Sequence, residues 1–165
     1  MNILLLDRDG TIIENIPYLN DENKVKIVEE CIYPLRVLND KGWKLSIVSN
    51  QSGIGRKLIS MKEVHAVNKR VRDLLLENEI FIDYIYFCPH APWQSCSCRK
   101  PNTRLIEKLL KRYKSIFNEP IDRVVMVGDS QSDIDAAKNA KIEGILLNKM
   151  KWLEIKEHLL NYKGS

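Results

Sequence analysis

Short apolar runs alternate along the chain with longer segments in which apolar residues recur at helical spacing. Runs of three or four apolar or aromatic residues are typical of strands buried in a parallel sheet. They predict five strands, at Ile3–Leu6, Leu45–Val48, Tyr84–Phe87, Val124–Val127 and Ile145–Leu147. The helical spacing predicts helices at Cys31–Lys41, from Ser60 onward, and at Thr103–Tyr113, Asp133–Lys141 and Trp152–Leu160.

Strands that alternate with helices predict a doubly wound, Rossmann-like α/β fold with a parallel sheet and right-handed crossovers. A length of 165 residues suits a single domain over residues 1–165. The polar segment Asn15–Lys26 contains Pro17 and is expected to be a loop of moderate length.

Composition narrows the classes of function. The chain has 26 Lys and Arg against 22 Asp and Glu, a net charge of +4. This mild excess suits a small anionic substrate and is too weak to indicate a nucleic-acid partner. No stretch approaches the roughly 20 apolar residues of a membrane span, and no signal peptide precedes the first strand. We therefore expect a cytoplasmic protein with reduced cysteines and no membrane partner, and a monomer because no long hydrophobic seam is present.

Chemically active residues directly follow four of the predicted strands. Asp7 follows the first strand, Ser49 the second, Cys88 the third and Gly128-Asp129 the fourth. In a doubly wound sheet the ligand site lies outside the carboxyl ends of the strands. We therefore expect all four positions to meet at one edge of the sheet.

The segment Asp7-Arg8-Asp9-Gly10-Thr11 offers two carboxylates, two residues apart, before a glycine. Both can turn toward one point, where a divalent cation would hold a phosphate against them. Asp7 would then attack phosphorus as a nucleophile, and Asp9 would act as the general acid and base. Taken alone, the same residues also fit an ordinary turn after a strand.

Three further motifs lie at the same predicted edge. Ser49-Asn50-Gln51-Ser52-Gly53 offers a hydroxyl group and backbone amides to phosphate oxygens. Arg99-Lys100 brings positive charge, and Gly128-Asp129-Ser130-Gln131-Ser132-Asp133 brings oxygen ligands of the kind that Mg²⁺ prefers. Each motif alone also fits a loop, a solvated surface or a helix start, so their common order and placement carry the prediction.

In this order the four motifs resemble those of the haloacid dehalogenase (HAD) superfamily of phosphotransferases: Asp-x-Asp-Gly-Thr, Ser/Thr, Lys and Gly-Asp-x-x-x-Asp. The resemblance covers roughly residues 3–147. It implies a Mg²⁺-dependent phosphomonoester hydrolase that forms an aspartyl phosphate on Asp7, with Asp9 as general acid and base. It further implies phosphate binding by Ser49 and Lys100.

By the same resemblance, the Mg²⁺ ligands are Asp7, the backbone carbonyl of Asp9 and Asp129, while Asp133 supports the site. The family inserts cap domains after its first motif or after its third strand. Neither position here leaves room for a large cap, so we expect an open active site.

A cluster of cysteines follows the third predicted strand. Cys88, His90, Cys96 and Cys98 lie within eleven residues and form a Cys₃His set, which is typical of structural zinc. A zinc-binding loop at about residues 88–98 is therefore expected. Plain reduced thiols and a redox switch remain alternatives, and Cys31 is expected to be an ordinary core residue.

A zinc loop directly before Cys-Arg-Lys-Pro is similar to the loop found in one branch of the superfamily, which contains heptose bisphosphate phosphatases and histidinol-phosphate phosphatases. Zinc would position Arg99 and Lys100 beside the phosphate. The segment from Ser49 to Arg56 is closer to the heptose enzymes, and Tyr18 matches a tyrosine of theirs. Arg56 suits a second phosphate, so a heptose bisphosphate is favoured over histidinol phosphate.

Part of the sequence favours the other substrate. The segment Lys100-Pro101-Asn102-Thr103-Arg104 lacks the Pro-Gly of the heptose enzymes and is closer to the histidinol-phosphate type. Two further alternatives are a zinc-stabilised binding module without catalysis and a nucleic-acid 3′-phosphatase. The four intact motifs disfavour the first. The second would need a basic groove with stacking aromatics, and Trp93 and Tyr18 are the only aromatic candidates near the site.

Overall fold

A single parallel sheet forms the centre of the computed structural model, which describes residues 1–161. Its strand order is β3-β2-β1-β4-β5. The strands are β1 (Asn2–Leu6), β2 (Lys44–Asn50), β3 (Ile82–Cys88), β4 (Arg123–Gly128) and β5 (Glu143–Leu146). The predicted doubly wound α/β fold is confirmed, and the strand order reverses between β1 and β4, which is where such folds bind ligands.

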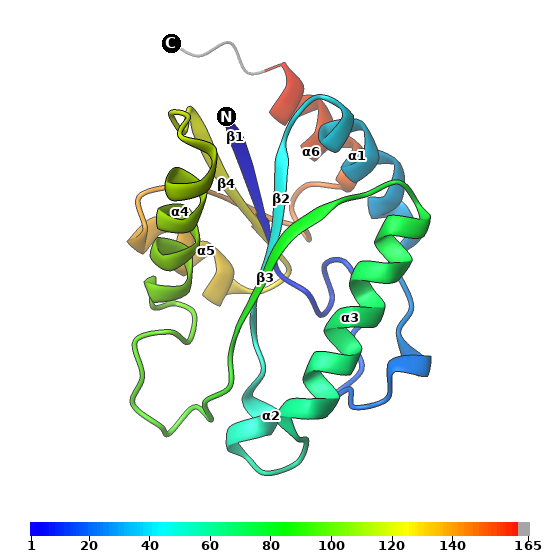
Figure 1. Ribbon diagram of the computed structural model, residues 1–165, viewed down its shortest axis with the longest axis vertical. Coiled ribbons are helices and arrows are strands. Elements are labelled where there is room, and N and C mark those ends of the chain that lie inside the picture. Colours follow the sequence, from blue (N-terminus) through cyan, green and yellow to red (C-terminus); the bar gives the residue numbers. More distant parts are fainter. Residues whose placement is uncertain (162–165) are drawn as a thin grey trace.

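Helices cover both faces of the sheet (Figure 1). One face carries α1 (Glu29–Asp40), α3 (Met61–Glu77) and α6 (Trp152–Leu160), and the other carries α4 (Arg104–Phe117) and α5 (Gln131–Asn139). Alternate residues of β1 divide between the two cores, because successive side chains of a strand point to opposite faces. Leu4 and Leu6 pack toward α1 and α3, whereas Ile3 and Leu5 pack toward α4 and α5.

The structure differs from the predicted elements mainly at their ends. Strand β2 continues to Asn50 because it pairs with β3 as far as Cys88. The predicted loop after β2 contains a one-turn helix, α2 (Ser52–Gly55). The predicted loop at residues 15–26 contains a short 3₁₀ helix (Glu22–Lys24), which its polar composition did not indicate.

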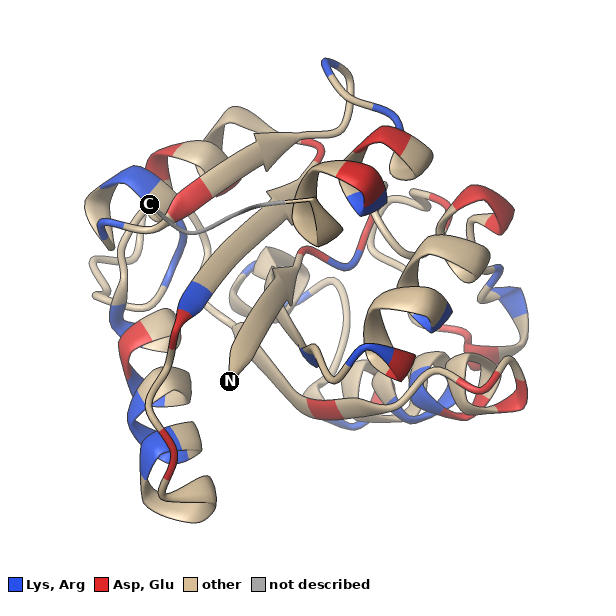
Figure 2. Ribbon diagram, turned by 90° about the horizontal axis from the view of Figure 1, so that it is seen from above, with Lys and Arg blue, Asp and Glu red and all other residues tan. Residues whose placement is uncertain are grey.

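Charged residues lie outside the body of the sheet. In Figure 2 the strands are mostly uncharged, and Lys, Arg, Asp and Glu mark the helices, the loops and the strand ends. Within residues 1–161, no helix combines the length and the apolar character that crossing a membrane requires.

Candidate active site

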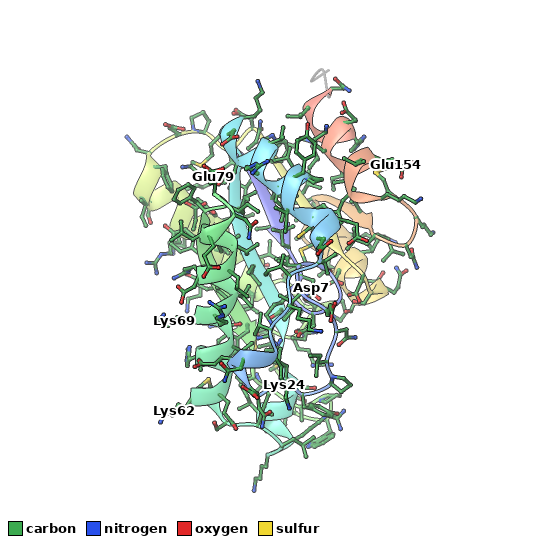
Figure 3. All side chains as sticks on the ribbon, turned by 90° about the vertical axis from the view of Figure 1, so that its right-hand side faces the viewer. Asp7, Lys24, Lys62, Lys69, Glu79 and Glu154 are labelled. Atoms are coloured by element: carbon green, nitrogen blue, oxygen red, sulfur yellow. The ribbon has the colours of Figure 1, made fainter. Side chains whose placement is uncertain are left out.

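Asp7 lies where β1 ends, at the point where the strand order reverses. Figure 3 places it near the middle of the molecule, and its backbone N–H donates to Val127 O of β4 at 2.9 Å. Gly10 has φ +76°, and a Cβ atom there would lie 2.1 Å from Oδ2 of Asp129. Only glycine fits both the backbone conformation and the close approach. The first motif therefore turns back against the loop that follows β4.

Lys100 of the third motif contacts residues of the other three motifs. Its Nζ lies 2.6 Å from Asp7 Oδ1 and 2.6 Å from Asp133 Oδ1, and it donates to Val48 O at 2.6 Å. The side chain of Asn50 holds the backbone of Lys100 on both sides: Oδ1 accepts from Lys100 N–H at 2.9 Å, and Nδ2 donates to Lys100 O at 3.1 Å. A residue distant in sequence is thus fixed at the end of β2.

The charges in this cluster do not balance. Oxygens of Asp7, Asp129 and Asp133 all lie within 4.8 Å of one another, and one ammonium group faces them. Burial raises the pKa of Asp7 to about 6, an effect opposed by Lys100 and reinforced by Asp133. Burial and Asp133 also raise the pKa of Asp129. Three carboxylates with excess negative charge fit a small divalent cation that prefers oxygen ligands.

The ammonium group of Lys100 remains charged despite full burial. Burial alone would lower the pKa of Lys100, but Asp7 and Asp133 outweigh it and raise the pKa above its usual range. Asp133 is itself held by the loop that follows β4, because its Oδ2 accepts hydrogen bonds from the hydroxyl and the backbone N–H of Ser130. Lys100 is therefore a fixed positive charge beside Asp7.

The carboxylate of Asp9 turns toward a different set of partners. Arg8 donates to it from Nε and Nη2, at 3.1 and 3.0 Å, and Gln51 Nε2 donates at 2.7 Å. Arg8 is fully buried and also donates to Asn68 Oδ1 on α3. Sequence reasoning assigned no role to Arg8 or Asn68. The signal available for Arg8 was its place between the two aspartates, directly after a buried strand.

A cavity of about 160 Å³ opens beside Asp9. Its lining includes four of the predicted substrate-binding residues: Tyr18, Asn50, Gln51 and Ser52. The predicted phosphate binder Ser49 is buried at the end of β2, with its Oγ 3.4 Å from Gln51 Nε2. The structure therefore brings these residues to the same edge of the sheet as Asp7.

Cys88 ends β3, and His90, Cys96 and Cys98 of the following segment, residues 89–103, converge on it. Cys88 Sγ lies 3.7 Å from Cys96 Sγ and 3.2 Å from Cys98 Sγ, and His90 Nδ1 lies 3.2 Å from Cys98 Sγ. A zinc tetrahedron with Zn–S bonds of about 2.3 Å has edges of about 3.8 Å. All four cysteines of the chain are free thiols, so the donor set and its spacing fit a structural zinc ion.

The two predicted substrate arginines, Arg56 and Arg99, lie at this same loop. The guanidinium of Arg56 stacks over the ring of Trp93, 4.9 Å from its centroid. Arg56 Nε and Arg99 Nη1 are buried and have no hydrogen-bond partner among the residues the structure describes. The loop also contacts α2 directly, since Gly55 N–H donates to Pro89 O at 2.8 Å.

Comparison with known proteins agrees with the fold and the motifs. Residues 97–149 match the HAD-hydrolase-like family model. The chain is 37% identical over 148 residues to a "Probable D-glycero-D-manno-heptose-1,7-bisphosphate 7-phosphatase" of Thermoplasma volcanium, covering 89% of this chain and 99% of that one. The chain therefore belongs to the HAD superfamily of phosphatases and to the same family as the Thermoplasma protein.

Two other proteins bear on the choice within the family. The "Histidine biosynthesis bifunctional protein HisB" of Campylobacter jejuni is 29% identical over 162 residues, which are 96% of this chain and 45% of that one. The solved structure of a D,D-heptose 1,7-bisphosphate phosphatase from B. bronchiseptica, in complex with magnesium and phosphate, has a TM-score of 0.84. It is 24% identical and covers 97% of this chain and 98% of its own, so this likeness concerns the fold.

Proposed function

We propose that this phosphatase is a D-glycero-D-manno-heptose-1,7-bisphosphate 7-phosphatase. One geometric observation supports the chemistry: a buried Asp7 at the strand switch point, with Lys100 Nζ at 2.6 Å and two more carboxylates within 4.8 Å. The choice of substrate is supported by the Thermoplasma relative and by the two arginines at the cysteine loop.

In the first half of the reaction, a carboxylate oxygen of Asp7 forms a bond to phosphorus while the bond to the leaving oxygen breaks. Lys100 stabilises the charge on the phosphoryl oxygens, and the hydroxyl of Ser49 donates to one of them. Asp9 gives its proton to the leaving oxygen, which departs as an alcohol. The product of this half is an aspartyl phosphate on Asp7.

In the second half, water attacks the aspartyl phosphate and the bond between phosphorus and Asp7 breaks. Asp9, now ionised, takes a proton from the attacking water. Inorganic phosphate leaves, Asp7 is regenerated as a carboxylate and Asp9 as an acid. The same carboxyl group thus serves both halves, and protons balance over one turnover.

Two metal ions complete the proposal. Asp7, Asp129 and the backbone carbonyl of Asp9 would hold Mg²⁺, which would offset the repulsion between the carboxylates and the phosphate. Cys88, His90, Cys96 and Cys98 would hold a structural Zn²⁺. Zinc would thereby fix the loop that places Lys100 at the transferred phosphate and Arg99 near the second phosphate.

Arg56 and Arg99 are proposed to bind the second phosphate of the substrate. Arginine pairs with phosphate through a planar fork of donors, and each of these two has a buried nitrogen without a partner among residues 1–161. Tyr18, Asn50, Gln51 and Ser52 border the cavity beside Asp9 and would contact the sugar. We also propose a single domain with a zinc loop at about residues 88–98, a monomer, and a cytoplasmic location.

Histidinol phosphate is the second candidate substrate, favoured by the likeness to the Campylobacter protein. Phosphate release with Mg²⁺ should be measured in parallel on D-glycero-D-manno-heptose 1,7-bisphosphate and L-histidinol phosphate. A preference in kcat/KM of about 100-fold or more for the bisphosphate is expected, since a second charged group is recognised by two arginines. A preference for histidinol phosphate would move the enzyme to that substrate and leave the chemistry unchanged.

A further inference from the structure

Arg8 lies between the two aspartates of the first motif and is fully buried. A buried guanidinium is costly unless its donors are satisfied. The Nε and Nη2 atoms of Arg8 donate to Asp9. In addition, Nη1 donates to Asn68 Oδ1 at 2.7 Å, and Nη2 donates to Gln51 Oε1 at 2.9 Å. Three separate elements therefore meet at this one side chain: the end of β1, the residue after β2, and α3.

Asn68 connects this group to the helix. It is 5% exposed on α3, and its Oδ1 accepts the bond from Arg8. Its Nδ2 is buried and makes no hydrogen bond to any residue that the structure describes. Asn68 thus contributes one acceptor oxygen, which holds Nη1 of Arg8, the guanidinium nitrogen that does not contact Asp9.

The bonds to Asp9 leave its two oxygens unequal. Oδ2 accepts from Arg8 Nε and from Gln51 Nε2, whereas Oδ1 accepts from Arg8 Nη2 alone. A carboxylate has about two acceptor positions on each oxygen. Oδ2 is therefore filled, and one position of Oδ1 remains open in a side chain that is 23% exposed beside the cavity.

We propose that Arg8, held by Asn68 and Gln51, is a positioning residue that aims Oδ1 of Asp9 at the transferred proton. This inference rests on the proposed function, in which Asp9 serves as acid in the first half and base in the second. Loss of the Asn68 oxygen frees one end of Arg8 and lets the Asp9 carboxylate rotate. Both proton transfers then slow, while Asp7, Lys100 and the phosphate contacts stay in place.

An activated substrate separates the two transfers. The p-nitrophenolate group leaves without needing a proton, so p-nitrophenyl phosphate tests the second transfer alone. When only the attack of water is slowed, the aspartyl phosphate accumulates. The signature is a lower kcat, a lower KM and a burst of p-nitrophenolate before steady state.

The experiment compares Asn68→Leu with the wild-type enzyme by rapid-quench kinetics on p-nitrophenyl phosphate with Mg²⁺. Leu keeps the branched shape of Asn at Cγ, although it is larger, and removes the acceptor. We expect kcat to fall about tenfold with a parallel fall in KM, and a burst of about one p-nitrophenolate per enzyme. Asn68→Asp restores an acceptor oxygen and should return kcat toward the wild-type value.

Val71→Ala is the matched control, since Val71 is fully buried on the same helix and outside the hydrogen-bonded group. It should lower the melting temperature and leave the kinetic signature of the wild type. A fall in kcat for Asn68→Leu without a burst, or an Asp variant as impaired as the Leu variant, would overturn the positioning role. A wild-type enzyme that hydrolyses no phosphate ester would instead refute the proposed function.

Discussion

The molecule contains two clusters of potential metal ligands, and the chain builds them in different ways. The carboxylate cluster joins Asp7 and Asp129, which follow β1 and β4, to Asp133 in the first turn of α5, and Lys100 links Asp7 to Asp133 through ion pairs of 2.6 Å. In the cysteine cluster, Cys88 ends β3, and the other three ligands, His90, Cys96 and Cys98, lie in the segment without helix or strand that follows it as far as Arg104. The first is organised by sheet hydrogen bonds and the second by contacts within a loop.

This difference separates catalysis from folding. The ends of β1 and β4 and the start of α5 position the carboxylates, so a change there should alter the reaction and leave the fold. The loop has few backbone hydrogen bonds of its own, and long loops of this kind are uncommon unless something orders them. A change to its ligands should alter stability first and activity through it, because the same loop carries Lys100.

Removal of the nucleophile should have the largest effect on the reaction. Asp7→Asn keeps the shape and removes the attacking oxygen, so kcat should fall by about 10⁴-fold or more. Circular dichroism and the melting temperature should stay close to the wild type, because Lys100 keeps Asp133 as a partner. Asp73→Asn, at an exposed pair with Lys69, is the control and should leave kcat unchanged. Normal turnover by the Asp7 variant would refute the mechanism.

Loss of zinc should have the largest effect on the fold of the loop. Cys98→Ser removes one of the four ligands, so the zinc content found by metal analysis should fall from about one per chain to near zero. The free energy of unfolding should fall by about 3 kcal/mol or more. Far-ultraviolet dichroism should change little, since the loop has no helix or strand. Cys31→Ser, at a buried cysteine outside the cluster, should keep the zinc. A zinc-free preparation of equal stability and activity contradicts the role of the loop.

Substrate recognition beside the cysteine loop should show a smaller effect. Arg56→Ala should raise KM for the heptose bisphosphate about 10- to 100-fold and leave KM for a monophosphate nearly constant, because only the former carries a second phosphate. Lys57→Ala is the matched control and removes an adjacent exposed charge. An equal rise in KM for both substrates would indicate that Arg56 acts by holding Trp93 in the loop.

The smallest effect is expected at the amino ends of the strands, far from both clusters. Glu143 of β5 pairs with Arg123 and His158. Burial alone would raise the pKa of Glu143, but hydrogen bonds from His158 and Arg123 outweigh it and lower the pKa. These two ion pairs therefore stabilise the protein at pH values above the ordinary Glu pKa of about 4.3. This stabilisation is lost as the pH falls through the pKa of Glu143 in the folded state.

Glu143→Gln should accordingly cost less than about 1 kcal/mol of unfolding free energy at pH 7, as is usual for pairs near the surface. The difference from the wild type should shrink as the pH is lowered below about 4. Denaturant titrations at several pH values give this difference, together with kcat as a control that should not move. A constant difference at all pH values would show that packing, and not charge, accounts for it.

The sequence predicted the fold and the edge of the sheet that carries the site, because both follow from patterns along the chain. Apolar runs locate the strands, and the residues after them lie together in any sheet of this topology. The partners of those residues could not be predicted in the same way. Arg8 pairs with Asn68 across 60 positions, and Asn50 holds the backbone of a residue 50 positions away. Such contacts depend on the angle at which α3 and the loop pack, which no local pattern encodes.

The central claim is that a covalent bond to phosphate forms on Asp7. The direct test is to quench the enzyme during turnover with borohydride, which reduces an aspartyl phosphate to homoserine, and to map the product by mass spectrometry. We expect homoserine at position 7 only when substrate and Mg²⁺ are both present. Reduction at another carboxylate, or rapid turnover with no reduced residue at all, would contradict the claim.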